Sequence, residues 1–136
     1  MEQALERALK RSETEGKWRQ RYHFTPPVSW MNDPNGLVYY KGLYHLFYQY
    51  NPKSCEWGSM HWGHAVSEDM IHWKDLPLAI YPDIEYAVFS GSSLVEEDRV
   101  IAMYHGFGIG NMIATSSDPL LLNWEKNENC PVIPHI

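Results

Sequence analysis

One carboxylate in a short polar segment could act as a nucleophile. Asp33 is followed by Pro34, Asn35 and Gly36, an order close to that of a type I β-turn. A proline turn just before a strand would fix the direction of the Asp33 side chain, as attack on a carbon atom from one side requires. Asn32 could keep Asp33 ionised by hydrogen bonding or hold a substrate hydroxyl. The alternative is that these residues form a turn and nothing more.

Gln49 is a polar residue within the apolar segment 46–50. Strand alternation places Phe47 and Gln49 on one face, and Tyr48 and Tyr50 on the other. Burying an amide without partners is costly. Gln49 therefore either faces solvent on a half-exposed strand or grips the hydroxyls of a sugar.

Aromatic residues make up 14% of the chain, and eleven of the nineteen fall between Tyr22 and Trp62. Such crowding is typical of a large β core or of rings that stack on sugar faces. Trp57 and Trp62, with a polar loop between them, indicate an aromatic wall beside a cleft, unless one or both belong to the core. Phe89 and Ser90 begin a strand rich in small hydroxyl residues, which either lies near a rim or is an ordinary strand start.

Metal and cofactor chemistry has little support in the sequence. His61 and His64 lie three residues apart on a predicted strand and so point to opposite faces. Cys55 and Cys130 form neither a disulfide framework nor a metal motif. We therefore expect no metal site and no cofactor.

The elements around these residues predict an all-β fold preceded by a short helix. Residues 2–12 have amphipathic helical spacing, and residues 1–21 are interpreted as helix and linker. From residue 22 to 136, β-branched and aromatic runs alternate with turn residues. The pair Lys41–Gly42 predicts a tight hairpin. The predicted strands are Gly36–Tyr40, Leu43–Tyr50, His61–Ser67, Val88–Val95, Arg99–His105 and Asn111–Ser116.

A weak internal repeat relates residues 64–82 to residues 113–134. Asp69 in the first copy corresponds to Asp118 in the second, and each is expected to cap a turn. A recurrence near fifty residues is the size of a β-propeller blade, although a chance turn-plus-Trp pattern is the alternative. A propeller needs about four to eight blades to close, and 136 residues provide only about two. Unpaired sheet edges would then favour dimerisation or aggregation.

Charge and hydropathy exclude some partners. The net charge of −6 favours neither nucleic acid nor an anionic membrane surface. No run approaches the roughly 18 apolar residues of a membrane span. The N-terminal residues lack the apolar region of a secretory signal, so the prediction is a cytoplasmic location. The oligomeric state is left open.

The motifs together resemble glycoside hydrolase family 32, which includes invertases, sucrose-6-phosphate hydrolases, inulinases and levanases. The resemblance rests on WMNDPNG, LFYQYNP, WGSMHWGHAVSED and FSGS, and it extends from about Tyr22 to Pro134. It implies the first two or so blades of a five-bladed β-propeller. The residues W-R-x-R-Y-H resemble, more weakly, the bacterial sucrose-6-phosphate hydrolase branch.

The resemblance also implies roles for individual residues. Asp33 would be the nucleophile of a retaining reaction on a β-fructofuranoside, in which a second carboxylic acid about 5–5.5 Å away protonates the leaving oxygen. The partner would be a small carbohydrate. The residues implied to bind it are Trp30, Met31, Asn32, Gln49, Trp57, Phe89 and Ser90.

The sequence departs from the family in two respects. The Glu-Cys motif of the acid and the Arg-Asp-Pro motif of the transition-state stabiliser do not occur, since Asn129 separates Glu128 from Cys130. The link from Tyr81 to Val88 is short and lacks the usual glycine, which leaves the rim at Phe89 and Ser90 uncertain.

Three functions remain open from the sequence. The first is the nucleophile half of a fructosidase, inactive by itself. The second is a sugar-binding module without catalysis, which would not need Asp33. The third is a fructosyltransferase, in which a sugar replaces water as the acceptor.

Overall fold

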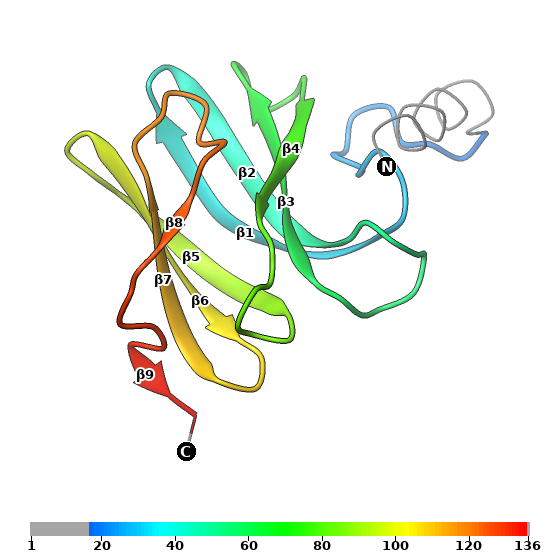
Figure 1. The fold of residues 1–136 in the computed structure, drawn as a ribbon. Coiled ribbons are helices and arrows are strands. Elements are labelled where there is room, and N and C mark those ends of the chain that lie inside the picture. The colour runs from blue at the N-terminus through cyan, green and yellow to red at the C-terminus, as the bar shows by residue number, and fades with distance from the viewer. Residues whose placement is uncertain (1–16, 136) are drawn as a thin grey trace.

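A computed structural model describes residues 17–135, which fold into two antiparallel sheets (Figure 1). The first sheet contains β1 (Trp30–Tyr40), β2 (Leu43–Asn51), β3 (His61–Ser67) and β4 (Lys74–Ile80) in chain order. The second contains β5 (Val88–Glu96), β6 (Arg99–Gly106), β7 (Gly110–Ser116) and β8 (Glu125–Lys126), and β9 (Ile133–Pro134) also pairs with β7.

These elements confirm the all-β prediction. No helix occurs in residues 17–135, and hence none that could cross a membrane. The predicted helix at residues 2–12 lies outside the described residues.

Strand β4 was not predicted, because Lys74, Asp75 and Pro77 interrupt its apolar pattern. Proline cannot donate to a sheet ladder and is tolerated on an edge strand. β4 is the last strand of the first sheet and pairs only with β3 among the strands of that sheet. Its place at the edge therefore explains how a strand forms against the local sequence signal.

The predicted type I turn at Asp33–Gly36 is wrong. These residues lie inside β1, where Pro34 is paired with Tyr48 and Asn35 with Phe47 of β2. The register shifts on each side of this pair, between Met31 and Pro34 and again further along β1. Pairing with β2 overrides the turn tendency, and the irregular strand accommodates the proline that a regular ladder would exclude.

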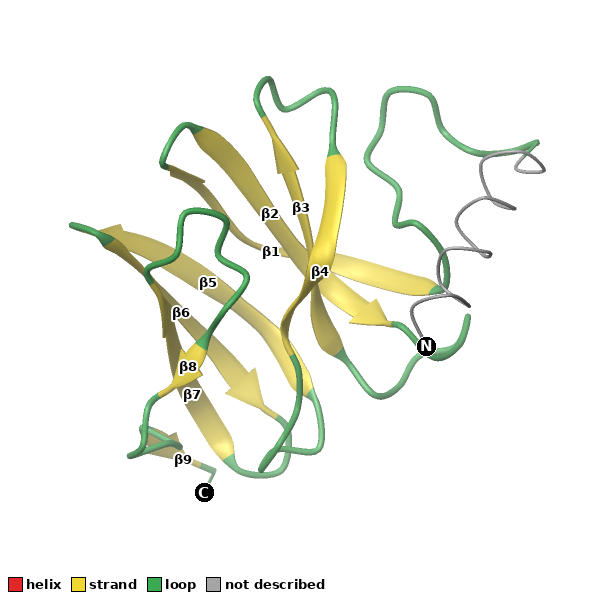
Figure 2. Ribbon diagram, turned by 45° about the horizontal axis from the view of Figure 1, so that its top comes forward, coloured by secondary structure: helices red, strands yellow, loops and turns green. Residues whose placement is uncertain are grey.

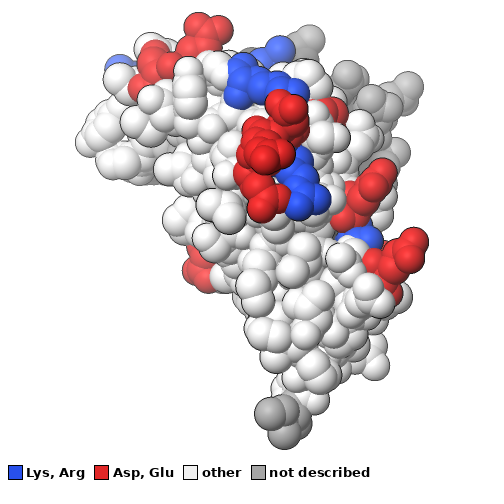
Figure 3. Space-filling model, turned by 90° about the vertical axis from the view of Figure 1, so that its left-hand side faces the viewer, with Lys and Arg blue, Asp and Glu red and all other residues white. Residues whose placement is uncertain are grey.

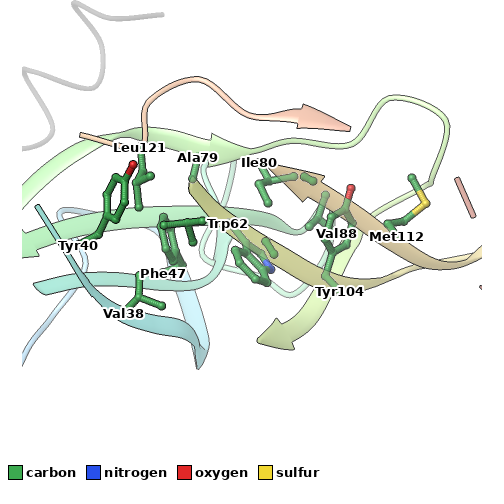
Figure 4. Packing of buried hydrophobic residues seen from close by; sticks show 13 residues of the cluster. Val38, Tyr40, Phe47, Trp62, Ala79, Ile80, Val88, Tyr104, Met112 and Leu121 are labelled. Atoms are coloured by element: carbon green, nitrogen blue, oxygen red, sulfur yellow. The ribbon is translucent and has the colours of Figure 1, made fainter. Parts of the chain in front are cut away.

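The main core lies between the two sheets (Figure 4). Phe47 stacks on Trp62 within the first sheet, with ring centroids 5.6 Å apart, and Trp62 meets Tyr104 of the second sheet at 5.9 Å. The opposite face of β2 forms a second cluster, in which Tyr48 contacts Phe24 at 5.1 Å. The predicted alternation of side chains along β2 is thereby confirmed.

The sequence repeat corresponds to a repeated structural unit. Asp69 follows β3 and Asp118 follows β7, and their carboxylates accept backbone N–H groups at 2.7–2.9 Å and 2.8–3.1 Å respectively. In each unit a tryptophan, Trp73 or Trp124, donates its indole N–H to the carbonyl three residues earlier, at 3.2 and 2.9 Å. Both aspartates cap turns, as predicted.

Replacing Gly36 with alanine is expected to destabilise the fold by about 1–3 kcal/mol, since the added methyl group overpacks a site that has no room for it. Gly36 has φ of +50°, and a Cβ there would lie 2.4 Å from Ser93 Oγ and 3.1 Å from the Trp62 ring. Gly42 is the matched control, because its φ is +91° but nothing lies within 4 Å of a Cβ. Urea unfolding should show a clearly smaller loss of unfolding free energy for Gly42→Ala than for Gly36→Ala. Equal losses would mean that the strain of a positive φ, and not overpacking, causes the destabilisation.

Candidate active site

The ends of several strands meet where the two sheets approach each other through β1 and β5 (Figure 2). Because both sheets are antiparallel, the start of β1 lies beside the end of β2, and the start of β5 beside the end of β6. The Val88 N–H donates to the Met60 carbonyl at 2.9 Å and so connects β5 to the loop before β3. This topology brings Asp33 of β1 close to Ser90 of β5.

The Asp33 carboxylate is held through both of its oxygens. Ser90 Oγ donates to Oδ2 at 2.6 Å, and Asn32 Nδ2 donates to Oδ1 at 3.3 Å. Asn32 is in turn oriented by Trp30, whose indole N–H donates to its Oδ1 at 3.0 Å. Asp33, Asn32 and Ser90 are all exposed. The carboxylate is therefore oriented and remains accessible, which are the two conditions for a nucleophile.

Gln49 lies behind this group rather than in solvent. It is buried, and its Nε2 donates to the Val88 carbonyl at 2.9 Å, two residues before Ser90. The buried amide of Asn35 accepts from the Gly91 N–H at 3.4 Å in one orientation and, with its oxygen and nitrogen exchanged, from Gln49 Nε2 at 3.3 Å instead. In either orientation the amides of Asn35 and Gln49 connect the strands behind Asp33. No role was predicted for Asn35 from the sequence, because the residue was placed in a turn and the burial of its amide follows only from the pairing of β1 with β2.

The two tryptophans of the predicted wall have different positions. Trp57, in the loop between β2 and β3, is 58% exposed, and its ring meets Phe89 edge-on with centroids 6.0 Å apart. Trp62 is fully buried in the core and donates its indole N–H to the Phe89 carbonyl at 3.0 Å. Trp57 therefore forms part of the surface beside Ser90, whereas Trp62 supports it from within.

Met31 lies elsewhere. Its half-buried side chain packs against the second cluster, which contains Leu46, Tyr48, Tyr50 and Ala65. Of the residues implied to bind a sugar, Asn32 and Ser90 contact Asp33 directly, and Trp30 is connected to it through Asn32. Gln49, Trp57 and Phe89 are connected to it only through the start of β5, which carries Ser90. Met31 supports β1 from the outer face of the first sheet.

His61 and His64 have separate partners. His64 Nε2 lies 3.0 Å from His45 Nδ1 in the core, and the His61 ring contacts the Ser59 carbonyl. Burial lowers the pKa of all three rings, that of His64 to about 3. Within residues 17–135 no group of three or more potential metal ligands is found.

The site can thus orient one carboxylate beside exposed aromatic rings, with amide and hydroxyl groups close by. Aromatic rings can cover the apolar face of a sugar, and amides and hydroxyls can bond its polar edge. An oriented carboxylate in such a place can attack an anomeric carbon.

Comparison with known proteins agrees with this chemistry. The family model for the N-terminal domain of glycosyl hydrolases family 32 matches residues 23–136. The chain is 46% identical over 132 residues to levanase of Bacillus subtilis, covering 87% of this chain and 19% of the relative. It is 47% identical over 127 residues to beta-fructofuranosidase 1 of Zea mays, covering 85% and 19%. The chain therefore spans about a fifth of the length of these relatives.

Solved structures give the same result. The GH32 beta-fructofuranosidase of Bombyx mori superimposes with a TM-score of 0.81 at 38% identity, over 98% of this chain and 31% of that one. A mutant of that enzyme in complex with sucrose gives a TM-score of 0.80 at 37% identity, with the same coverage. A variant of fructan 1-exohydrolase IIa from Cichorium intybus in complex with 1-kestose gives 0.77 at 39% identity, over 85% and 24%. The match of the family model, together with that of sequence and fold, shows that this chain belongs to glycosyl hydrolase family 32.

Proposed function

We propose that Asp33 is the nucleophile of a retaining β-fructosidase to which this chain contributes the nucleophile half of the active site. The observation that carries the proposal is the exposed Asp33 carboxylate, oriented at both oxygens by Asn32 and Ser90. Related family members are levanases and beta-fructofuranosidases, and solved relatives contain sucrose or 1-kestose. Since the chain covers about a fifth of its relatives, catalysis is proposed for the whole protein.

The proposed reaction has two displacements. An Asp33 oxygen forms a bond to the anomeric carbon of the fructosyl unit while the bond to the leaving oxygen breaks, and a second carboxylic acid gives that oxygen its proton. Water then attacks the fructosyl ester, loses a proton to the same second group and releases Asp33. Residues 1–136 contain neither a Glu-Cys nor an Arg-Asp-Pro motif to supply the other groups.

The remaining assignments follow from this role. Residues 22–136 would form about two blades of a five-bladed propeller, with residues 1–21 as a leading segment. Ser90 and Asn32 would hold Asp33 in position, and Trp57 and Phe89 would cover one face of the sugar. Gln49 would support the pocket through its hydrogen bond to β5, and Trp30 through its hydrogen bond to Asn32.

A substrate whose leaving group needs no proton tests the nucleophile separately from the missing acid. With β-D-fructofuranosyl fluoride, Asp33 forms a bond to the anomeric carbon as fluoride departs, so general acid catalysis is not required. We expect intact-mass spectrometry of the 136-residue chain to show the addition of one fructosyl unit, located on Asp33 by peptide mapping.

Asp33→Asn is the matched variant, because it keeps the shape of the side chain and removes the charge. It should show no adduct, whereas Asp98→Asn, at an exposed aspartate in the turn between β5 and β6, should react like the parent chain. An adduct that persists in Asp33→Asn would contradict the assignment. A sugar-binding module would be favoured instead if the parent chain and Asp33→Asn bind sucrose with equal affinity and neither forms an adduct with the fluoride. With sucrose itself, the isolated chain should show negligible hydrolysis.

A further inference from the structure

We propose that a row of four aromatic rings, three exposed and one half-buried, binds the leaving-group side of β-fructosides longer than a disaccharide. The row, called the aromatic strip, consists of Trp57, Phe89, Phe107 and Tyr86. The inference rests on the proposed function, because it assumes that a fructosyl unit occupies the position next to Asp33. It adds a surface for the sugars that follow that unit.

The rings form a continuous series. Phe89 is adjacent to Ser90 and stacks almost parallel to Phe107, with centroids 5.0 Å apart and 15° between planes. Trp57 meets Phe89 edge-on at 6.0 Å, and Tyr86 meets Phe107 edge-on at 6.4 Å. Phe89 and Phe107 therefore cover each other on one face, and the series connects Phe89, next to Ser90, with Tyr86.

The backbone fixes the outer half of the strip. The Tyr86 N–H donates to the Phe107 carbonyl at 3.1 Å, and the Phe107 N–H donates to the Ala87 carbonyl at 2.9 Å. Gly108 has φ of +90°, and a Cβ at this position would lie 2.6 Å from the Tyr86 ring. The absence of a side chain at Gly108 thus lets Tyr86 lie over the loop between β6 and β7. Rings held in this way lose little conformational entropy when a ligand binds.

The exposure of the strip favours a binding role. Trp57, Phe107 and Tyr86 are 58%, 46% and 78% exposed, although each is large enough to be a core residue. Contiguous exposed apolar surface commonly marks an interaction site. Because Phe89, the second ring of the strip, is adjacent to Ser90, which donates to Asp33, the strip continues the candidate active site rather than forming a separate patch.

The composition of the strip favours a sugar over a protein partner. All four members are flat rings, which match the apolar C–H face of a sugar. Elsewhere on the second sheet the exposed apolar residues Leu94 and Met103 are aliphatic and are better suited to packing against protein. The ring centroid of His105 lies 6.0 Å from that of Phe89, and His105 Nδ1 is hydrogen-bonded to Asn111 Oδ1 at 3.1 Å. Polar groups therefore border the strip. On the face drawn in Figure 3, acidic and basic side chains gather on the upper and middle parts of the molecule, and the lowest part shows neither.

The test is saturation-transfer NMR on the 136-residue chain with sucrose, 1-kestose and fructosylnystose. The signals of the third and later sugar units should receive saturation in the parent chain, and affinity should rise with chain length. In the double variant Phe107→Leu and Tyr86→Leu, which keeps apolar bulk but removes the flat rings, affinity for fructosylnystose should fall about two- to tenfold per ring. Affinity for sucrose should be unchanged. Tyr39→Leu is the control, because this tyrosine is 58% exposed, lies at the other end of β1 and contacts the Tyr44 ring at a tilt.

The outcomes separate the two proposals. If the parent chain binds sucrose and fructosylnystose equally, or if the double variant keeps the gain with length, the strip is contradicted and the proposed function stands. If none of the three sugars receives saturation from a chain whose ¹H–¹⁵N spectrum shows it folded, the proposed function is contradicted and the strip with it. The strip would also be contradicted if the affinity of the Tyr39→Leu chain no longer rises with the number of sugar units.

Discussion

Replacing Lys126 with methionine is expected to lower the free energy of unfolding by about 3–5 kcal/mol, because it leaves a buried negative charge without its partner. Lys126 Nζ lies 2.7 Å from Glu85 Oε1, and the Glu85 side chain is fully buried. The same ammonium group donates to the Tyr81 carbonyl at 2.9 Å and to Asp83 Oδ1 at 2.7 Å. Tyr104 donates to Glu85 Oε1 at 2.9 Å, but this neutral donor cannot balance the charge.

The matched control is the ion pair between Arg99 and Glu96, whose side chains are 53% and 47% exposed. An exposed pair contributes about 0–1 kcal/mol, so Arg99→Gln should have little effect. Urea denaturation of both variants, with comparable m-values, provides the comparison. If Lys126→Met and Arg99→Gln lose similar amounts of unfolding free energy, the burial of Glu85 does not determine how much its ion pair stabilises the fold.

The ion pair of Lys126 and Glu85 also holds the short link between the two sheets in place. Residues Tyr81 to Val88 lack the usual glycine, yet Lys126 of β8 contacts the link at three points and Glu85 anchors it beneath β6. The strand that follows begins in register with β6 at Val88, and Ser90 reaches Asp33. The rim at Phe89 and Ser90 is therefore formed despite the short link.

Acidification is expected to remove about 4 kcal/mol of stability between pH 6.5 and pH 3 through the buried pair His45 and His64. Burial, followed by the proximity of His45, lowers the pKa of His64 from 6.5 to about 3, and burial also lowers the pKa of His45. The folded state keeps His64 neutral, whereas the unfolded state takes up a proton below pH 6.5. Stability is thus fully present above pH 6.5 and falls by about 1.4 kcal/mol per pH unit until His64 itself titrates.

Asp118 is the charged group that acts on both rings, and its negative charge partly opposes the effect of burial. Between pH 7 and pH 5, urea unfolding should show a loss of about 2 kcal/mol attributable to His64. His64→Gln should be less stable at pH 7 but should flatten this pH dependence. His23→Gln, at an exposed histidine, serves as the control. An unchanged slope in His64→Gln would assign the acid sensitivity to other groups.

Much of the fold was predictable because β-strands carry a period-two signal. The alternation around Gln49, the hairpin at Lys41–Gly42 and the turns capped by Asp69 and Asp118 all depend on residues close in sequence. Predictions failed where a distant partner decided the structure. Strand β4 forms because β3 offers an edge, and residues 33–36 extend because β2 pairs with them.

The sequence by itself determined the family, the all-β class and the identity of the candidate nucleophile, because the motif around Asp33 and the strand periodicity are local features. Only the tertiary structure showed that Ser90 donates to Asp33 across 57 residues, that Gln49 holds Val88, and that Phe107 joins the aromatic row. The physical reason is that the contacts of Ser90 and Gln49 arise from the packing of one sheet against the other, and that of Phe107 from the pairing of β5 with β6. The position of a side chain relative to a second sheet depends on register and twist, which local residue preferences do not encode.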